Sequence, residues 1–126
     1  MTYPEIIKPV PGFPDYWASN AGRIFSMKRG RCTELKPYDS VNRSGPHLIV
    51  QMYKSGPIGK RKRKTKTVHS IVADTFELSK PPGAYMIRHW NGNYRDCSLH
   101  NLVYGTAKDN SNDTKRYNEE IDTSWI

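Results

Sequence analysis

The order of apolar and polar residues predicts short strands over the first half of this 126-residue chain. Three prolines between residues 9 and 14 exclude a helix there, because proline lacks a backbone donor and restricts the residue before it to extended forms. From residue 22 apolar and polar residues alternate, as they do in a half-buried strand. Further along, strands over 48–53 and 61–68, joined by a loop over 54–59, predict a hairpin.

The spacing of apolar residues becomes helical after this hairpin. Val68, Ile71, Val72 and Phe76 fall near a period of 3.6 residues, and Leu78 follows close to it. Two prolines a few residues later end the pattern. We therefore expect a short helix that ends before these prolines and packs under the hairpin.

Two further short strands and a helix are expected in the last third of the chain. An apolar run leads into His89 and the turn sequence Asn-Gly-Asn at 91–93, and a second apolar run follows at 102–104. A helix opens at Thr106, where Asp109 three residues on resembles a capping partner. The helix sequence that follows is poor in helix-forming residues, a conflict that is expected at functional sites.

Three polar residues in this last third are spaced so that they could lie close together in the fold. His89 ends the first strand, Asn101 follows 12 residues later, and Asn110 follows 21 residues after His89. The strand, loop, strand and helix would bring the three together. They could then hold one divalent metal and one general base against a phosphodiester. Taken alone, His89 is better explained as an ordinary histidine at a strand end.

Length and composition indicate one small domain, because 36% hydrophobic residues in 126 positions support only a thin core. Neither a membrane span nor a signal peptide is readable, so we expect a cytoplasmic protein, in the bacterial host if a phage encodes it. The two cysteines, Cys32 and Cys97, cannot form a zinc quartet or a disulfide framework. We expect both to be free thiols.

The net charge of +8 predicts an acidic partner. Six of the seven residues from 60 to 66 are cations, namely Lys60, Arg61, Lys62, Arg63, Lys64 and Lys66. Cations that neutralise phosphates release counterions, so binding to duplex DNA should weaken steeply with salt, by a slope of about 0.9 per contact. A solvated basic strand or a localisation tract is the alternative explanation of this run.

Several segments resemble one known family, in that family's order and spacing. Residues 12–26, which begin Gly-Phe-Pro-Asp-Tyr-Trp, look like the NUMOD-type module at the start of many phage and intron HNH endonucleases. Four further segments resemble the HNH nuclease core of the same group, namely residues 68–76, 88–93, 99–102 and 105–113. The resemblance extends over about residues 5–114.

This resemblance implies a fold class and a division of the chain. The implied class is α+β, with a small antiparallel β N-terminal module and a ββα-metal HNH core. The module is expected over residues 1–58, and the nuclease core, including the basic hairpin strand, over residues 59–126. The implied activity is metal-dependent hydrolysis of phosphodiester bonds in double-stranded DNA, of phage or mobile-element type.

The resemblance also implies roles for single residues. His89 matches the general base that activates water, Asn101 the asparagine that pins the loop between the strands, and Asn110 the residue whose side-chain oxygen binds the metal. One divalent ion is implied, Mg²⁺ first, with Mn²⁺ expected to support activity as well. Many relatives carry a second metal ligand directly before the base. This chain has Arg88 there, which cannot bind a metal but could grip a phosphate.

Two functions are compatible with these residues. The first is an active endonuclease or nickase, monomeric if it cuts one strand and homodimeric if it cuts both. The second is a DNA-binding module that keeps the fold but has lost cleavage, which Arg88 makes conceivable.

Other side chains have a structural explanation beside a functional one. His69 could hydrogen-bond the hairpin or reach a phosphate, and Asp113 could hold a water or pair with Arg116. His47 and His100 are expected on the surface. Three aromatic residues of the first module are expected in its core rather than as platforms for bases, namely Phe13, Tyr16 and Trp17.

Overall fold

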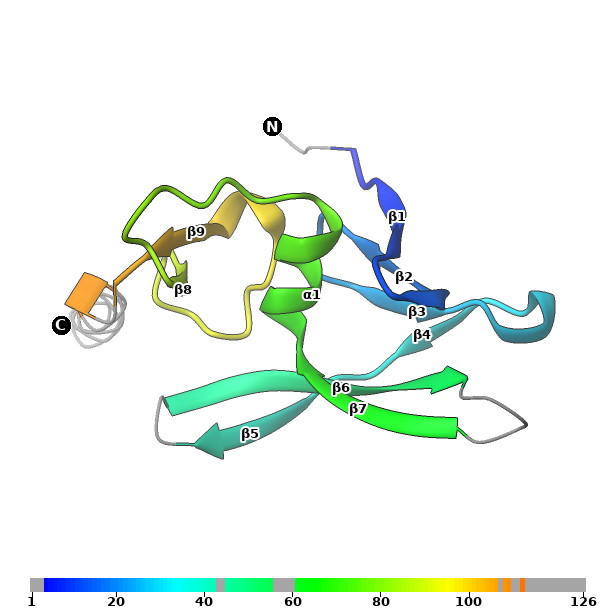
Figure 1. Ribbon diagram of the computed structural model, residues 1–126. Helices are drawn as coiled ribbons and strands as arrows, with labels where there is room; N and C mark the ends of the chain where they lie inside the picture. The colour runs from blue at the N-terminus through cyan, green and yellow to red at the C-terminus, as the bar shows by residue number, and fades with distance from the viewer. Residues whose placement is uncertain (1–3, 43–44, 56–60, 107, 110–111, 113–126) are drawn as a thin grey trace, which may run out of the picture.

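The structure is a computed structural model that describes residues 4–42, 45–55, 61–106, 108–109 and 112. The described residues form three small antiparallel sheets around a short central helix (Figure 1). None of the helices among them is both long and apolar enough to cross a membrane.

The N-terminal sheet has four strands in the order β1, β2, β3 and β4, which are β1 (Ile7–Val10), β2 (Phe13–Ser19), β3 (Ile24–Ser26) and β4 (Thr33–Leu35). A single turn of 3-10 helix, η1 (Lys28–Gly30), precedes β4. Pro9 lies in β1, an edge strand, where the missing donor costs least. Phe13 and Tyr16 are buried and Trp17 is half-buried. The prediction of extended structure is confirmed, and so is the core position of Phe13 and Tyr16, whereas Trp17 is not among the residues of the core cluster.

The second sheet contains the expected hairpin. Its strands are β5 (Tyr38–Asn42), β6 (Gly45–Ser55) and β7 (Arg61–Thr67), in that order. β6 begins earlier than the alternation indicated, because its first half pairs with β5 and its second half pairs with β7. The register places Lys64 opposite Met52 and Arg63 opposite Tyr53, so cations occupy both faces of β7 as predicted.

The helix α1 (Val68–Thr75) follows β7 directly and buries Val68, Ile71 and Val72. It ends before Leu78, because Glu77 adopts a left-handed backbone with φ of 52°. The backbone N–H of Leu78 then donates to the carbonyl of Ala73 at 2.9 Å, which closes the helix end. Leu78 still packs against the core, and this explains why its spacing looked helical in the sequence.

The third sheet pairs β8 (Met86–His89) with β9 (Leu102–Gly105), preceded by the 3-10 turn η3 (Leu99–Asn101). The expected capping pair follows β9: Thr106 N donates to Asp109 Oδ2 at 3.0 Å, and Asp109 N donates to Thr106 Oγ1 at 3.2 Å. Residues 108–109 are helical. Two strands and a helix start are thus described, and the rest of the expected ββα motif lies outside the described residues.

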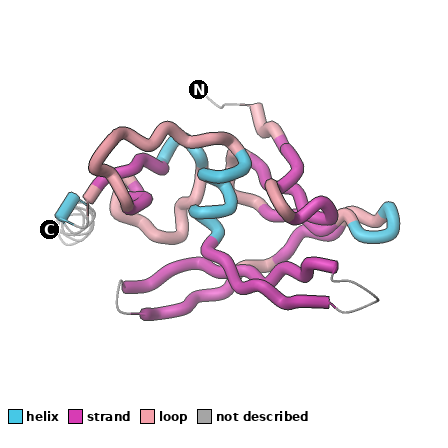
Figure 2. The backbone as a smooth tube through the Cα atoms, in the orientation of Figure 1, coloured by secondary structure: helices cyan, strands magenta, loops and turns pink. Residues whose placement is uncertain are grey.

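One core joins the three sheets. α1 lies between the N-terminal sheet and the β8–β9 pair (Figure 2). The hydroxyl of Tyr16 in β2 accepts a hydrogen bond from Tyr53 N in β6 at 2.9 Å. The buried cluster draws on all three sheets and on α1, with members that include Val10, Ile24, Val50, Met52, Ile71, Cys97 and Leu102.

The turn between β2 and β3 braces the loop between β8 and β9. Leu99 N donates to the carbonyl of Asn20 at 2.8 Å. Gly22, with φ of 87°, lies so close that a Cβ there would sit 2.9 Å from the carbonyl carbon of Cys97. The first sheet therefore positions the segment that follows His89.

Candidate functional site

His89 is the last residue of β8 and pairs with Leu102 of β9. Its side chain is buried, with 6% of the residue exposed. The Nε2 atom lies 3.8 Å from the thiol sulfur of Cys97, which is also buried. The imidazole of His89 is thus buried next to the thiol of Cys97.

Asn101 locks the segment that follows His89. Its side-chain oxygen accepts a hydrogen bond from Asn91 N at 3.0 Å, and its Nδ2 donates to Asn91 Oδ1 at 3.0 Å and to the carbonyl of Asp96 at 2.9 Å. Its backbone carbonyl accepts from Trp90 N at 2.7 Å. These bonds are the contacts that a loop-pinning residue needs, and a buried amide with all its groups paired is rigid.

The turn after His89 is closed by hydrogen bonds from side chains as well as from the backbone. Gly92 has a φ of 76° and donates to the carbonyl of His89 at 2.8 Å, which confirms the expected turn. Asn91 also contributes its side chain, which accepts from Asn93 N at 2.9 Å and donates to Asp96 Oδ2 at 3.0 Å. The Asn-Gly-Asn run carried this signal, since asparagine side chains commonly close such turns.

Three histidines from three different elements meet beside this loop. The ring of His69 in α1 lies edge-on to the ring of His89, with centroids 5.1 Å apart. The ring of His47 in β6 lies 5.6 Å from that of His69. All three line a cavity of about 440 Å³, together with Lys80, Tyr85, Tyr94 and Tyr104 among others.

The expectation that His47 is a simple surface residue was wrong, because it is half-buried, its ring lies against that of His69 in α1, and it lines this cavity. Nothing in the local pattern around His47 marks this contact. His100 is exposed, as expected.

The three imidazoles are held in their neutral forms. Burial lowers the pKa of His89 from 6.5 to about 4, and the charge that His47 would carry adds to this effect. Burial also lowers the pKa of His69 to about 3, with further contributions from His89 and His47. The pKa of His47 is lowered by burial as well. Near neutral pH the cavity therefore presents uncharged rings.

The first turn of α1 orients His69. Thr67 Oγ1 donates to Ser70 Oγ at 2.8 Å, and Ser70 Oγ donates to the carbonyl of Thr67 at 2.9 Å. The Thr67 hydroxyl therefore accepts from His69 Nε2, 3.3 Å away. The opposite atom, Nδ1, is buried and has no hydrogen-bond partner among the described residues. His69 contacts the end of the hairpin, as one of its two expected roles requires.

Arg88 lies on the face of β8 opposite to His89. Its guanidinium stacks over the ring of Trp90, with 5.3 Å to the centroid. Its side chain crosses Gly105 so closely that a Cβ there would collide with it and with the Asp109 carboxylate. Hydrogen bonds from Thr106 lower the pKa of Asp109, and the charge of Arg88 lowers it further. The cation therefore stands beside the start of the last helix.

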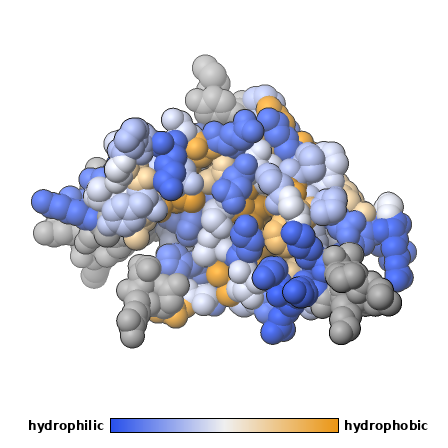
Figure 3. All heavy atoms as spheres, in the orientation of Figure 1, coloured by the Kyte–Doolittle hydropathy of each residue, from blue (hydrophilic) through white to orange (hydrophobic). Residues whose placement is uncertain are grey.

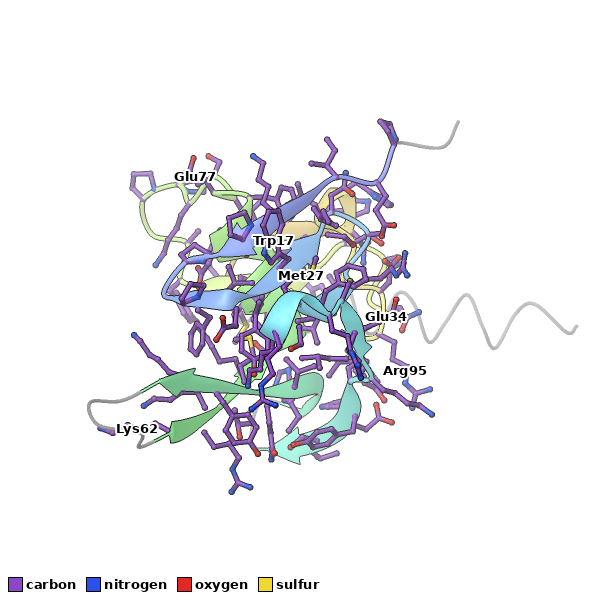
Figure 4. The ribbon with its side chains drawn as sticks, turned by 90° about the vertical axis from the view of Figure 1, so that its right-hand side faces the viewer. Trp17, Met27, Glu34, Lys62, Glu77 and Arg95 are labelled. Carbon is purple, nitrogen blue, oxygen red and sulfur yellow. The ribbon has the colours of Figure 1, made fainter. Side chains whose placement is uncertain are left out.

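The described cations of β7 do not line this cavity. Lys62, Arg63 and Lys64 are exposed, and Lys66 is half-buried over the ring of Phe13 with Asp74 3.8 Å from its Nζ. Hydrophilic residues gather where this hairpin ends (Figure 3), and the side chain of Lys62 points away from the body (Figure 4).

Several of the expected site residues fall outside the described residues. These are Asn110, Asp113 and Lys60, and the side chain of Arg61 is likewise not described. Within the described ranges, no group of three histidine, cysteine or acidic side chains is arranged to hold a metal ion. Both cysteines are free, as expected, with Cys32 exposed and Cys97 buried.

Comparison with known proteins identifies the class. Residues 5–100 match the family described as the NUMOD4 motif, so the chain belongs to this family. It is similar to an uncharacterized HNH endonuclease of Acanthamoeba polyphaga mimivirus, with 27% identity over 97 residues, or 77% of this chain and 22% of that protein.

A solved structure is also similar, that of the HNH homing endonuclease I-HmuI, which binds and cleaves DNA. The TM-score is 0.63 with 28% identity, over 88% of this chain and 59% of that one. The chain thus spans about a fifth of the curated relative and under two thirds of the solved one.

Proposed function

We propose that this chain binds double-stranded DNA and hydrolyses its phosphodiester bonds with the help of one divalent metal ion, as an HNH endonuclease or nickase. The observation that carries the proposal is His89, a neutral imidazole at the end of β8 that lines a cavity while Asn101 locks the loop behind it. The similarity to two HNH endonucleases supports the same reading.

The chemistry assigned to His89 follows from its protonation state. A neutral ring can take the proton of an attacking water, and general bases of this kind contribute roughly 10² to 10⁴ in rate. A pKa of about 4 makes the free ring a weak base. Phosphate oxygens nearby would stabilise the imidazolium and raise the pKa toward neutrality. Bound DNA would therefore strengthen the base that its own cleavage needs.

The donors around the start of the last helix fit a hard cation. Thr106 and Asp109 present oxygen atoms, and Asn110 follows in the sequence. Asp109 Oδ2 already accepts from Thr106 N, so we expect the amide oxygen of Asn110 to hold the ion. Mg²⁺ accepts oxygen ligands and keeps several waters, and Mn²⁺ is expected to replace it. When bound, the ion would stabilise the charge that develops on the leaving oxygen.

The cations of β7 are proposed to contact the DNA backbone. Replacing Lys62 and Lys64 together by glutamine should weaken binding at all sequences and lower the slope of log affinity against log salt by up to about 2, or about 0.9 per lost contact. Titrations of a labelled duplex at several salt concentrations measure this slope.

The matched control for this pair is Arg31→Gln with Lys36→Gln, which removes the same charge from exposed positions outside the hairpin. The control should leave the slope nearly unchanged. An equal fall in both double variants would mean that net charge, and not contact with the hairpin, drives binding.

A DNA-binding module without cleavage is the second candidate, and Arg88 favours it because a guanidinium beside the start of the last helix cannot serve as a metal ligand. The two candidates differ in one assay. We expect supercoiled plasmid to become nicked or linear with Mg²⁺ or Mn²⁺, and to stay intact with a chelator. If the chain binds DNA but no divalent ion supports conversion of the plasmid, the second candidate is favoured. Nicked product would indicate action on one strand, and linear product paired action by two copies.

A further inference from the structure

The thiol of Cys97 lies within hydrogen-bonding distance of two groups. Its sulfur is 3.8 Å from His89 Nε2 and 3.5 Å from the backbone carbonyl oxygen of Tyr94. The residue is only 3% exposed. The close approach of Gly22 and the hydrogen bond between Leu99 and Asn20 fix the backbone around it. The sulfur therefore has little freedom to move away from either partner.

The direction of both hydrogen bonds follows from a count of hydrogen atoms. A thiol has one hydrogen, and a backbone carbonyl can only accept. With both hydrogen bonds formed, the S–H points to Tyr94, and the sulfur lone pairs accept from His89. Burial raises the pKa of the thiol to about 12, so the hydrogen is present throughout the neutral range.

A carboxylate or a backbone carbonyl usually fixes the tautomer of a functional histidine. Asp96, which precedes Cys97, does not do so here, because both of its oxygens accept hydrogen bonds from other residues. Asp96 Oδ1 accepts from the Ser98 hydroxyl at 2.7 Å, and Asp96 Oδ2 accepts from Asn91 Nδ2 at 3.0 Å. Cys97 is thus the partner of His89 Nε2 among the described residues. Those residues offer no partner to Nδ1 of the same ring, which lines the cavity.

We propose that Cys97 is a positioning residue that holds neutral His89 in the tautomer with hydrogen on Nε2, so that the Nδ1 lone pair is the one that accepts a proton in the reaction. The sulfur fixes the ring orientation as well, because it anchors one edge of the imidazole. This assigns the accepting atom, and its catalytic consequence rests on the proposed function.

The tautomer can be measured without any activity. In the full chain labelled with ¹⁵N-histidine, long-range proton–nitrogen NMR correlations at neutral pH should show His89 with a protonated Nε2 and a bare Nδ1. The cross-peaks are assigned by their loss in His89→Gln. In Cys97→Ala the buried N–H loses its acceptor, and the proton should distribute over both nitrogens. A wild-type ring with hydrogen on Nδ1 would overturn the proposal, whatever the enzyme does.

Plasmid nicking tests the consequence. Cys97→Ala should lower kcat about three- to tenfold with KM nearly unchanged, in line with the loss of one weak hydrogen bond. Cys97→Ser should recover most of this loss, because a hydroxyl can donate to Tyr94 and accept from His89. Cys32→Ala, which removes the exposed thiol, is the matched control and should have no effect.

Thermal melts identify any variant that has lost the fold. If folded Cys97→Ala kept both the wild-type tautomer and the wild-type kcat, the thiol would not set the geometry of His89 and the proposal would fail. If the NMR result holds but the wild-type chain nicks no plasmid, the tautomer assignment stands and the proposed nuclease activity is what fails.

Discussion

His89→Ala is expected to abolish plasmid nicking while the protein still binds DNA. The substitution removes the proposed general base, so the rate should fall by roughly 10² to 10⁴. Binding should persist, because the exposed cations of β7 are outside the cavity that His89 lines and are unchanged by the substitution. Nicking rates and duplex titrations on the same preparations measure the two effects separately.

His100→Ala is the matched control for this variant, since His100 is an exposed histidine in the same segment. It should nick at nearly the wild-type rate. His89→Gln, which fills more of the vacated space, guards against loss of fold and should be equally inactive. If folded His89→Ala retained substantial activity, another group would have to be the base, and the adjacent ring of His69 would be the first to test.

The second large effect is a loss of stability in mild acid. The pKa of His69 is about 3 and that of His89 about 4 in the folded chain, against 6.5 for an ordinary histidine. The unfolded chain therefore binds protons between pH 6.5 and 4 that the folded chain does not. Stability is complete above pH 6.5 and declines as the pH falls below it. At pH 5 each histidine should lower the free energy of unfolding by about 2 kcal/mol relative to pH 8.

Together the two histidines should cost about 4 kcal/mol at pH 5, a large share of the 5–15 kcal/mol that is typical of folded domains. Urea unfolding at pH 8, 6.5 and 5 measures the change. His69→Asn removes one titrating ring, so its stability should vary about half as much over this interval. A free energy of unfolding that is flat between pH 8 and 5 would show that these rings are not held neutral.

The elements of the fold were largely readable from residue patterns. Three prolines, alternation of apolar residues and the change of period at Val68 predicted extended structure near the N-terminus, the hairpin and α1, but β4 and β5 had no individual signal. The capping pair between Thr106 and Asp109 was predicted from their spacing alone. Such signals are local, because they depend on backbone geometry over a few residues.

Contacts between distant segments were not readable. Nothing near His47 indicates that it approaches His69, and nothing near Cys97 indicates that its sulfur contacts His89. The left-handed backbone at Glu77, which ends α1 early, also has no sequence signal, since glutamate rarely adopts it. Periodicity gives the face on which a residue lies but not the partner that it meets there.

For the candidate site, sequence spacing selected His89 and Asn101, and the structure gives their positions and hydrogen bonds. Their catalytic roles, and the metal-binding role of Asn110, stay predictions. The cavity and its neutral rings could not be anticipated, because burial depends on the packing of β6, α1 and β8 together.

The contacts between the first sheet and the loop that follows His89 determine how the chain could be divided into fragments. Removal of residues 1–58 would separate β6 from β7. It would also remove Asn20 and Gly22, which contact Leu99 and Cys97. The remaining fragment would have an exposed apolar face, and the loop that follows His89 would lose its support. A transplant of the His89 loop onto another scaffold would therefore have to include the strands β2 and β3 on either side of Gly22.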